Sequence, residues 1–135
     1  MLNLLDESIF NDSFLIDKFE SAIEGFKAPD HIEKILEDIN VLCTTCREKG
    51  WRALNTVDIE IKNIFIVDFI NLVSQANTQE ELINIISLVK PRLYHHGFSR
   101  KDFAEAVLYY EALLLILSGE TIDLIRLNLK SILNL

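Results

Sequence analysis

The sequence predicts an all-α fold, a single domain over residues 1–135 built as an antiparallel bundle or orthogonal array of five to six helices. Three observations support this prediction. Glycine and proline are scarce, with four and two residues, whereas folds made of strands and turns use more of both. Apolar residues recur at steps of three and four along most of the chain. Several of these runs are preceded by side chains that favour the N-cap position.

The first two helices are defined by their boundary residues. Residues 11–13, Asn-Asp-Ser, are good N-caps and open the first helix, whose break is marked by Gly25 and Pro29. The second helix then runs to Lys49 and Gly50. We expect the apolar face of the first helix to contain Phe14, Ile16, Phe19, Ile23 and Phe26. We expect the second helix to bury Ile32, Ile35, Leu36, Ile39, Leu42, Cys43 and Cys46, and to expose Glu33, Lys34, Glu37 and Asp38.

Residues 57–62 alternate between apolar and charged, as a strand would. We reject a strand here because no second strand is predicted that could pair with it. The apolar spacing continues into residues 64–73 at helical steps, so a helix is expected through this region. Ile59, Ile66 and Ile70 add a second apolar stripe to it. We therefore expect this helix to be apolar nearly all round and central in the fold.

The remaining helices carry clear start and stop signals. Thr78 with Glu81, and Ser99 with Asp102, have the spacing of capping boxes. Pro91 ends or kinks the helix that Thr78 opens. The helix after Ser99 contains residues 103–117 and is expected to end at Gly119. Thr121 then caps a last amphipathic helix that buries Ile122, Ile125, Leu129, Ile132 and Leu133.

Negative charge is concentrated at the start of the chain. Residues 1–38 hold ten acidic side chains against three lysines, whereas the whole chain carries a net charge of −8. The rest of the sequence is therefore nearly balanced. Segregated charge of this kind attracts partners of opposite sign and accelerates their association. It also disfavours nucleic acid as a partner, because the phosphate backbone would be repelled.

Two local motifs were weighed as chemical sites. Cys43 and Cys46 have the spacing of half a zinc site, but no second ligand pair exists and they fall late in a helix, so we interpret them as core residues. His95 and His96 lie among the bases Lys90, Arg92, Arg100 and Lys101 near a helix start. Such a loop can bind an anion, although it lacks a glycine-rich cradle. Whether it does so is left open.

Catalytic motifs were sought and not found. The sequence has no glycine-rich phosphate loop and no helical histidine pair with metal spacing. Asp68 and Glu111 each interrupt a run of large apolar residues, where a buried and paired carboxylate would be notable. A salt bridge or a position at the rim of the core is the commoner explanation. We therefore expect no enzyme activity, no cofactor, no bound metal and no membrane span.

The sequence favours a non-enzymatic protein-binding domain. By analogy of charge, size and class, we interpret it as an acidic inhibitor of the immunity or antitoxin type that binds a basic, nuclease-like protein in the cytoplasm. The alternative is an obligate helical homodimer that acts as an adaptor or assembly factor, because half the residues are hydrophobic. The residues expected to bind the partner are Asp17, Glu20, Glu24, Glu33, Glu37 and Asp38.

Overall fold

The computed structural model describes residues 2–24, 26, 29–95 and 97–134, and it confirms the predicted all-α fold. Within these ranges the regular elements are seven α-helices and three short 3₁₀ helices, with no strand. The α-helices are α1 (Ser13–Ile23), α2 (Pro29–Lys49), α3 (Ile64–Gln75), α4 (Gln79–Val89), α5 (Arg92–His95), α6 (Arg100–Leu117) and α7 (Ile122–Ile132). The 3₁₀ helices are η1 (Leu5–Glu7), η2 (Ile9–Asn11) and η3 (Trp51–Thr56).

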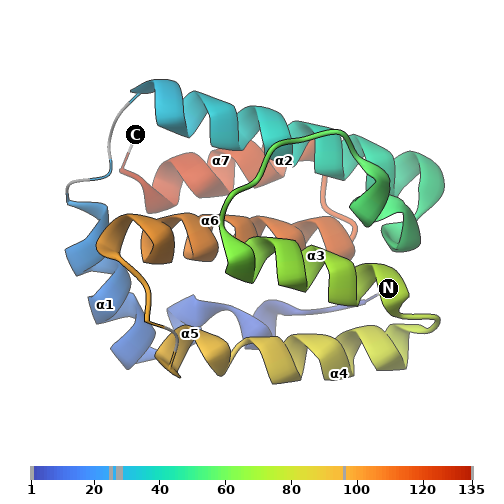
Figure 1. Ribbon diagram of the computed structural model, residues 1–135, viewed down its shortest axis with the longest axis horizontal. Helices are drawn as coiled ribbons and strands as arrows, with labels where there is room; N and C mark the ends of the chain where they lie inside the picture. The colour runs from blue at the N-terminus through green and yellow to red at the C-terminus, as the bar shows by residue number, and fades with distance from the viewer. Residues whose placement is uncertain (1, 25, 27–28, 96, 135) are drawn as a thin grey trace.

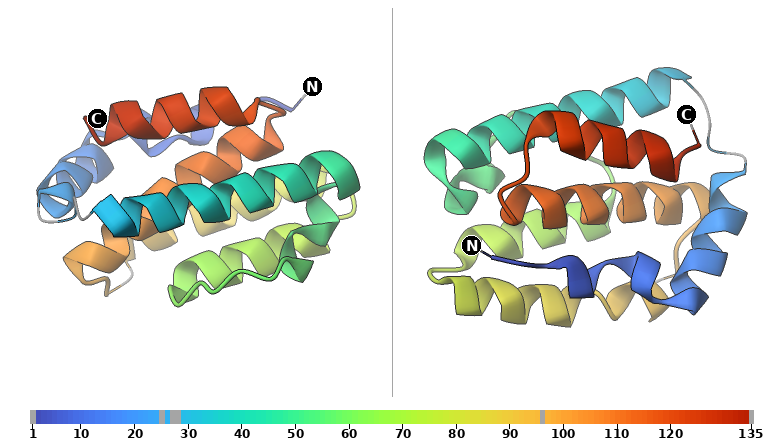
Figure 2. Two further views of the ribbon diagram at one scale, coloured as in Figure 1. Left: turned by 90° about the horizontal axis from the view of Figure 1, so that it is seen from above. Right: turned by 180° about the vertical axis from the view of Figure 1, so that it is seen from behind.

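Helix α6 is the centre of the fold. It contacts α1, α2, α3 and α7, and the other helices surround it (Figure 1). Thirteen of its eighteen residues are buried. Views from above and from behind show α7 lying beside α2 on one side of α6, with the N-terminal segment on another (Figure 2). The expectation that the helix after residue 57 would be central is therefore wrong, since that role belongs to α6.

The helices begin where their capping side chains stand. A side-chain oxygen of Asp12 accepts a hydrogen bond from the backbone N–H of Leu15 at 3.1 Å, and Thr78 does the same for Glu81 at 3.1 Å. Ser99 and Thr121 cap α6 and α7 in the same way. Gly119, which follows α6, has φ of +88°, a left-handed conformation that favours glycine. These four starts and this stop confirm the predicted N-caps and the helix end, whereas the carboxylate of Glu81 accepts the N–H of Asn77 and not that of Thr78.

The predicted face of this first helix is confirmed in part: Phe19, Ile23 and Phe26 are buried, Ile16 is half-buried, and Phe14 is exposed. Leu15 and Phe19 are buried with Ala22, Ile23 and the following Phe26, whereas Phe14 is 58% exposed. The side chain of Phe14 stacks on Tyr94 with ring centroids 5.5 Å apart. Residues 15, 19, 22 and 26 are also spaced by three and four, so two overlapping stripes satisfied the helical pattern. Packing against α6 selects the stripe that contains Leu15.

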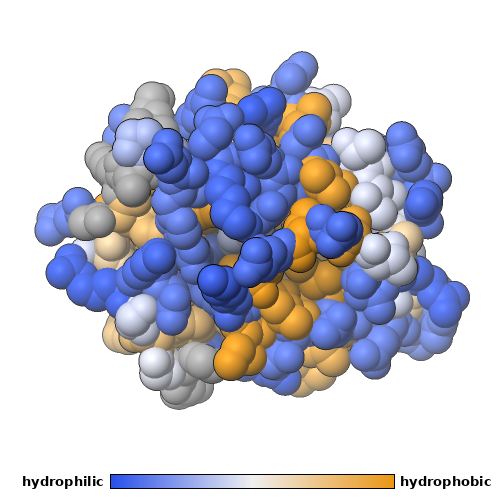
Figure 3. Space-filling model, turned by 45° about the horizontal axis from the view of Figure 1, so that its top comes forward, coloured by the Kyte–Doolittle hydropathy of each residue, from blue (hydrophilic) through white to orange (hydrophobic). Residues whose placement is uncertain are grey.

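Residues 57–63 form neither a helix nor a strand. The segment runs across α2 and returns to the start of α3, where apolar side chains form a band on the surface (Figures 1 and 3). Val57, Ile59 and Ile61 are half-buried, and the charged residues between them are exposed, which explains the alternation. Asn63 ends the segment, because its side chain accepts the N–H of Ile66 and donates to the carbonyl of Asp102. The predicted helix therefore begins only at Ile64.

Candidate functional site

Five of the six predicted partner-binding carboxylates are exposed on α1 and α2. Helix α1 crosses one end of the molecule, and α2 begins at the same end (Figure 1). On each helix these residues lie away from the buried stripe. None of the five forms an ion pair with another residue that the structure describes. We call this set the acidic surface, and it consists of Asp17, Glu20, Glu24, Glu33 and Glu37.

Asp38 does not belong to this surface, so its predicted exposure is wrong. It is 7% exposed, and one of its oxygens, Oδ2, lies 2.7 Å from both Lys34 Nζ and the hydroxyl of Tyr109. Helix α2 packs against both α6 and η3, so its buried face is wider than one stripe of apolar residues. Asp38 lies at the edge of that face and is satisfied by Lys34 and Tyr109. Burial, reinforced by Asp38, raises the pKa of Tyr109.

The two described lysines of this region point away from the acidic surface. Lys18 donates a hydrogen bond to the carbonyl of Leu93, and its Nζ lies 4.3 Å from the ring centroid of Phe103. Burial lowers the pKa of Lys18. Lys34 binds Asp38 and the carbonyl of Glu60, each at 2.7 Å. Because both cations are bound elsewhere, the carboxylates of the acidic surface are not neutralised by them.

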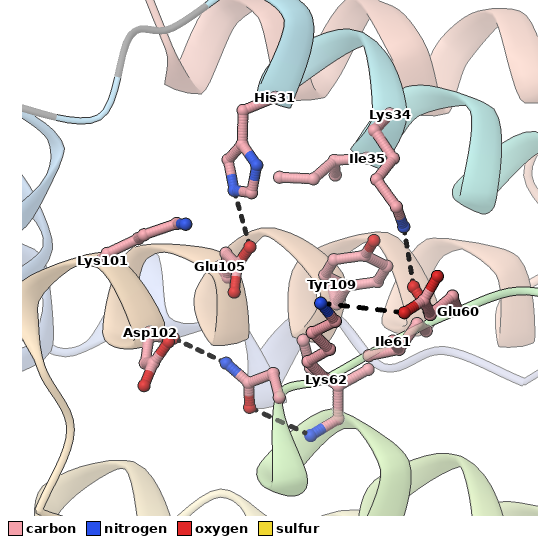
Figure 4. A pocket seen from close by; sticks show the side chains of 12 residues that line it. His31, Lys34, Ile35, Glu60, Ile61, Lys62, Lys101, Asp102, Glu105 and Tyr109 are labelled. Atoms are coloured by element: carbon pink, nitrogen blue, oxygen red, sulfur yellow. Dashed lines mark hydrogen bonds and ion pairs between the residues drawn. The ribbon is translucent and has the colours of Figure 1, made fainter.

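A pocket of about 400 Å³ lies between α2, α6 and the segment before α3 (Figure 4). His31 and Lys34 reach into it from α2, and Glu105 and Tyr109 reach into it from α6. Nε2 of His31 is 2.6 Å from Oε2 of Glu105, but this nitrogen forms no aligned hydrogen bond. The sequence gives no sign of this pocket, because its walls come from three separate segments.

The charges of this pocket largely compensate one another. His31 faces Glu105, Lys34 is held by Asp38, and Lys62 lies 3.7 Å from Glu60. Lys101 also lines the pocket and forms no ion pair with another described residue. Polar contacts beside the pocket join α2 to α6, His31 with Glu105 and Asp38 with Tyr109.

Of the two carboxylates that interrupt apolar runs, only Glu111 is buried. It is 5% exposed, and its Oε1 accepts hydrogen bonds from the Ser8 hydroxyl at 2.8 Å and the Ile9 N–H at 2.7 Å. Burial raises the pKa of Glu111 to about 7, although both hydrogen bonds and the charge of Lys90 act in the opposite direction. Asp68, in contrast, is exposed on α3.

The cysteine pair lies on the core side of α2. Cys43 is buried and Cys46 is half-buried; both thiols are free, and burial raises their pKa values.

The basic loop is only partly described, since His96 lies outside the described residues. Arg100, at the start of α6, donates to the carbonyl of Ser21. An anion site in this loop stays a prediction.

Among the described residues, no group of three or more His, Cys, Asp and Glu side chains is placed to hold a metal ion. No helix in the described ranges has both the length and the apolar character needed to cross a bilayer.

Comparison with protein-family models, with curated proteins and with solved structures found no match for this chain.

Proposed function

We propose that this chain is a non-enzymatic protein-binding domain that engages a basic protein through its acidic surface. The observation that carries the proposal is that Lys18 and Lys34 are bound elsewhere. In many helical proteins an exposed carboxylate is paired with a lysine one turn away. Here the carboxylates of α1 and α2 lack such partners among the described residues, so their charge is available to another molecule.

A basic enzyme that acts on nucleic acid is the kind of partner that suits this surface. Its substrate-binding face carries lysine and arginine side chains for phosphate groups, and carboxylates can occupy the same side chains. Long-range attraction between opposite charges increases the rate of encounter well above that of neutral surfaces. An inhibitor that must reach a toxin before its substrate does benefits from such a rate. The proposed role is therefore that of an immunity or antitoxin-type inhibitor.

The salt dependence of association tests this proposal. The products of the genes on either side of this one supply the partner candidates, and association rates would be measured by stopped-flow fluorescence. We expect one basic product to bind, with a rate that falls at least tenfold between 25 and 200 mM salt, because salt screens exposed charges. A binding partner whose association rate does not change with salt would contradict the proposal, as would the absence of any binding to either product.

A second copy of the chain is the alternative partner. The observation in its favour is the apolar band beside the segment before α3 (Figure 3). Val57, Ile59, Ile61 and Val67 line a shallow pocket there of about 120 Å³, and nearby Ile64 is 69% exposed. Exposed apolar patches of this kind often mark interfaces. Sedimentation at low and high salt separates the two proposals, because a dimer joined by apolar contacts keeps its doubled mass at both.

A further inference from the structure

A cavity of about 230 Å³ lies between the N-terminal segment, α6 and α7. The view from behind shows that the N-terminal segment, α6 and α7 all lie toward this side of the molecule (Figure 2). Its walls are mainly apolar, with Leu4, Phe10 and Leu114 contributed by two of the three elements. Serine and asparagine side chains supply the polar part of its lining: Ser8, Ser118, Asn128 and Ser131.

Glu111 is the one ionisable side chain among the described residues that line this cavity. Both of its described hydrogen bonds, from Ser8 and from the Ile9 N–H, go to Oε1. The second oxygen, Oε2, therefore has no described hydrogen-bond donor. A buried carboxylate is costly unless donors or an opposite charge satisfy it. Oε2 is not among the fully enclosed polar atoms that lack a partner, so it is open to the cavity that Glu111 lines.

The surroundings of Glu111 limit which class of ligand can bind its carboxylate. Lys90, at the end of α4, influences the carboxylate through its charge, but no ion pair joins the two in the described structure. An anion is excluded because no cation lines the cavity. A divalent metal ion is disfavoured because Glu111 is the one carboxylate among the described lining residues, and no group of His, Cys, Asp and Glu side chains is placed there to hold such an ion. The remaining class is a monovalent organic cation with an apolar body.

We propose that this cavity binds a small primary amine, with the ammonium group at Oε2 of Glu111 and a short alkyl chain against Leu114 and Leu4. The volume is below the usual range of roughly 300–1,000 Å³ for drug-sized ligands, so the ligand is a small one. Ser118, Asn128 and Ser131 provide further oxygens for the ammonium hydrogens. This binding site is independent of the acidic surface on α1 and α2.

The raised pKa of Glu111 is consistent with this proposal and gives it a pH signature. With a pKa of about 7, the carboxylate is mostly charged at pH 8 and mostly protonated at pH 6. An ammonium group binds the charged form. Affinity for an amine should therefore decrease by about tenfold between pH 8 and pH 6, in proportion to the charged fraction. Binding should in turn lower the pKa of Glu111.

Calorimetric titration with n-butylammonium chloride tests the proposal, with 1-butanol as a neutral ligand of similar shape. We expect saturable binding at pH 8, at least tenfold weaker binding of 1-butanol, and the stated loss of affinity at pH 6. Glu111→Gln should abolish binding, and Asp68→Asn, which removes an exposed acid on α3, should leave it unchanged. Carbon-13 NMR should show the pKa of Glu111 falling when butylammonium saturates the protein.

A cavity-filling variant keeps the test decisive if Glu111→Gln fails to fold. Ser118→Leu narrows the cavity but leaves the carboxylate and both of its donors in place, so it should lose butylammonium binding while the pKa of free Glu111 changes little. Equal binding of 1-butanol and butylammonium would overturn the proposal. So would the absence of saturable binding to the wild-type protein at pH 8, or undiminished binding by a folded Glu111→Gln variant.

Discussion

The hydroxyl of Tyr109 donates a hydrogen bond of 2.7 Å to the buried carboxylate of Asp38, and so joins α6 to α2. The same carboxylate oxygen accepts a hydrogen bond from Lys34. Asp38 is thereby satisfied within the molecule, although its neighbour Glu37 is exposed to solvent. Two adjacent acids in one helix therefore differ in their surroundings: Asp38 joins α2 to α6, whereas Glu37 faces solvent.

Tyr109→Phe tests whether the hydrogen bond between Tyr109 and Asp38 stabilises the fold. The substitution removes one donor from a buried carboxylate, and hydrogen bonds to charged groups contribute about 1.5–3 kcal/mol. We expect the free energy of unfolding in urea to fall by about 2 kcal/mol. In an Asp38→Asn background the same substitution should cost less, because the acceptor is no longer charged. Equal costs in the two backgrounds would show that the hydroxyl of Tyr109 does not act through the charge of Asp38.

The two neighbouring acids of α2 should respond oppositely to charge reversal. Glu37→Lys changes an exposed side chain, and substitutions of that kind usually alter stability by less than about 0.5 kcal/mol. Asp38→Lys places a cation beside Lys34 in a buried position and should cost about 3 kcal/mol or more. Thermal unfolding of the two variants at one pH measures the difference. Similar melting temperatures would mean that Asp38 is not buried in solution.

The buried face of α1 can be tested with its two phenylalanines. Phe19 is 2% exposed, so Phe19→Ala should lower the free energy of unfolding by about 3–5 kcal/mol. Phe65 is also buried, and truncating it should have an effect of the same size. Phe14→Ala is the matched control on the same helix, and we expect it to cost less than half as much because Phe14 is mostly exposed. Full stability in the Phe19 variant would disprove the face assignment.

Glu111 should make the stability of the protein depend on pH. Burial raises its pKa from 4.5 to about 7, so the folded state binds a proton more tightly than the unfolded state does. The resulting contribution of Glu111 to the free energy of unfolding is complete below about pH 4.5 and is lost as the pH rises through 7. Ser8, the Ile9 N–H and Lys90 oppose the shift, but burial outweighs them.

Comparison with Glu111→Gln isolates this effect from other titrating groups. Glutamine keeps an oxygen that can accept from Ser8 and Ile9, but it carries no charge. We expect the wild-type protein to lose stability relative to the variant between pH 5 and pH 8, by up to about 3 kcal/mol for the full shift. Urea unfolding at several pH values gives this difference. A constant difference across that range would show that the pKa of Glu111 is not raised.

Sequence patterns predicted most helix boundaries because these depend on local chemistry. The caps at Asp12, Thr78, Ser99 and Thr121 need only a side chain and the backbone of the next turn. Packing between distant segments is not local. The choice of Leu15 over Phe14 for burial depends on α6, and the extended path of residues 57–63 depends on their contacts with the core.

The same reasoning explains what could be predicted of the candidate site. Five carboxylates of the acidic surface were identified correctly as exposed, because exposure follows from helical periodicity. The burial of Asp38 could not be predicted, because it depends on a tyrosine in α6, 71 residues further along the chain. The pocket between α2 and α6 was missed for a related reason, since His31 and Glu105 meet only in the folded chain.

The most direct test of the central claim is charge reversal on the acidic surface, measured as an association rate. Glu20→Lys with Glu37→Lys should slow association with the basic partner by at least tenfold at low salt, and should leave thermal stability nearly unchanged. Asp68→Lys, an exposed acid on α3, is the control and should alter the rate by less than twofold. Equal rates for the double variant and the Asp68 control would contradict the account.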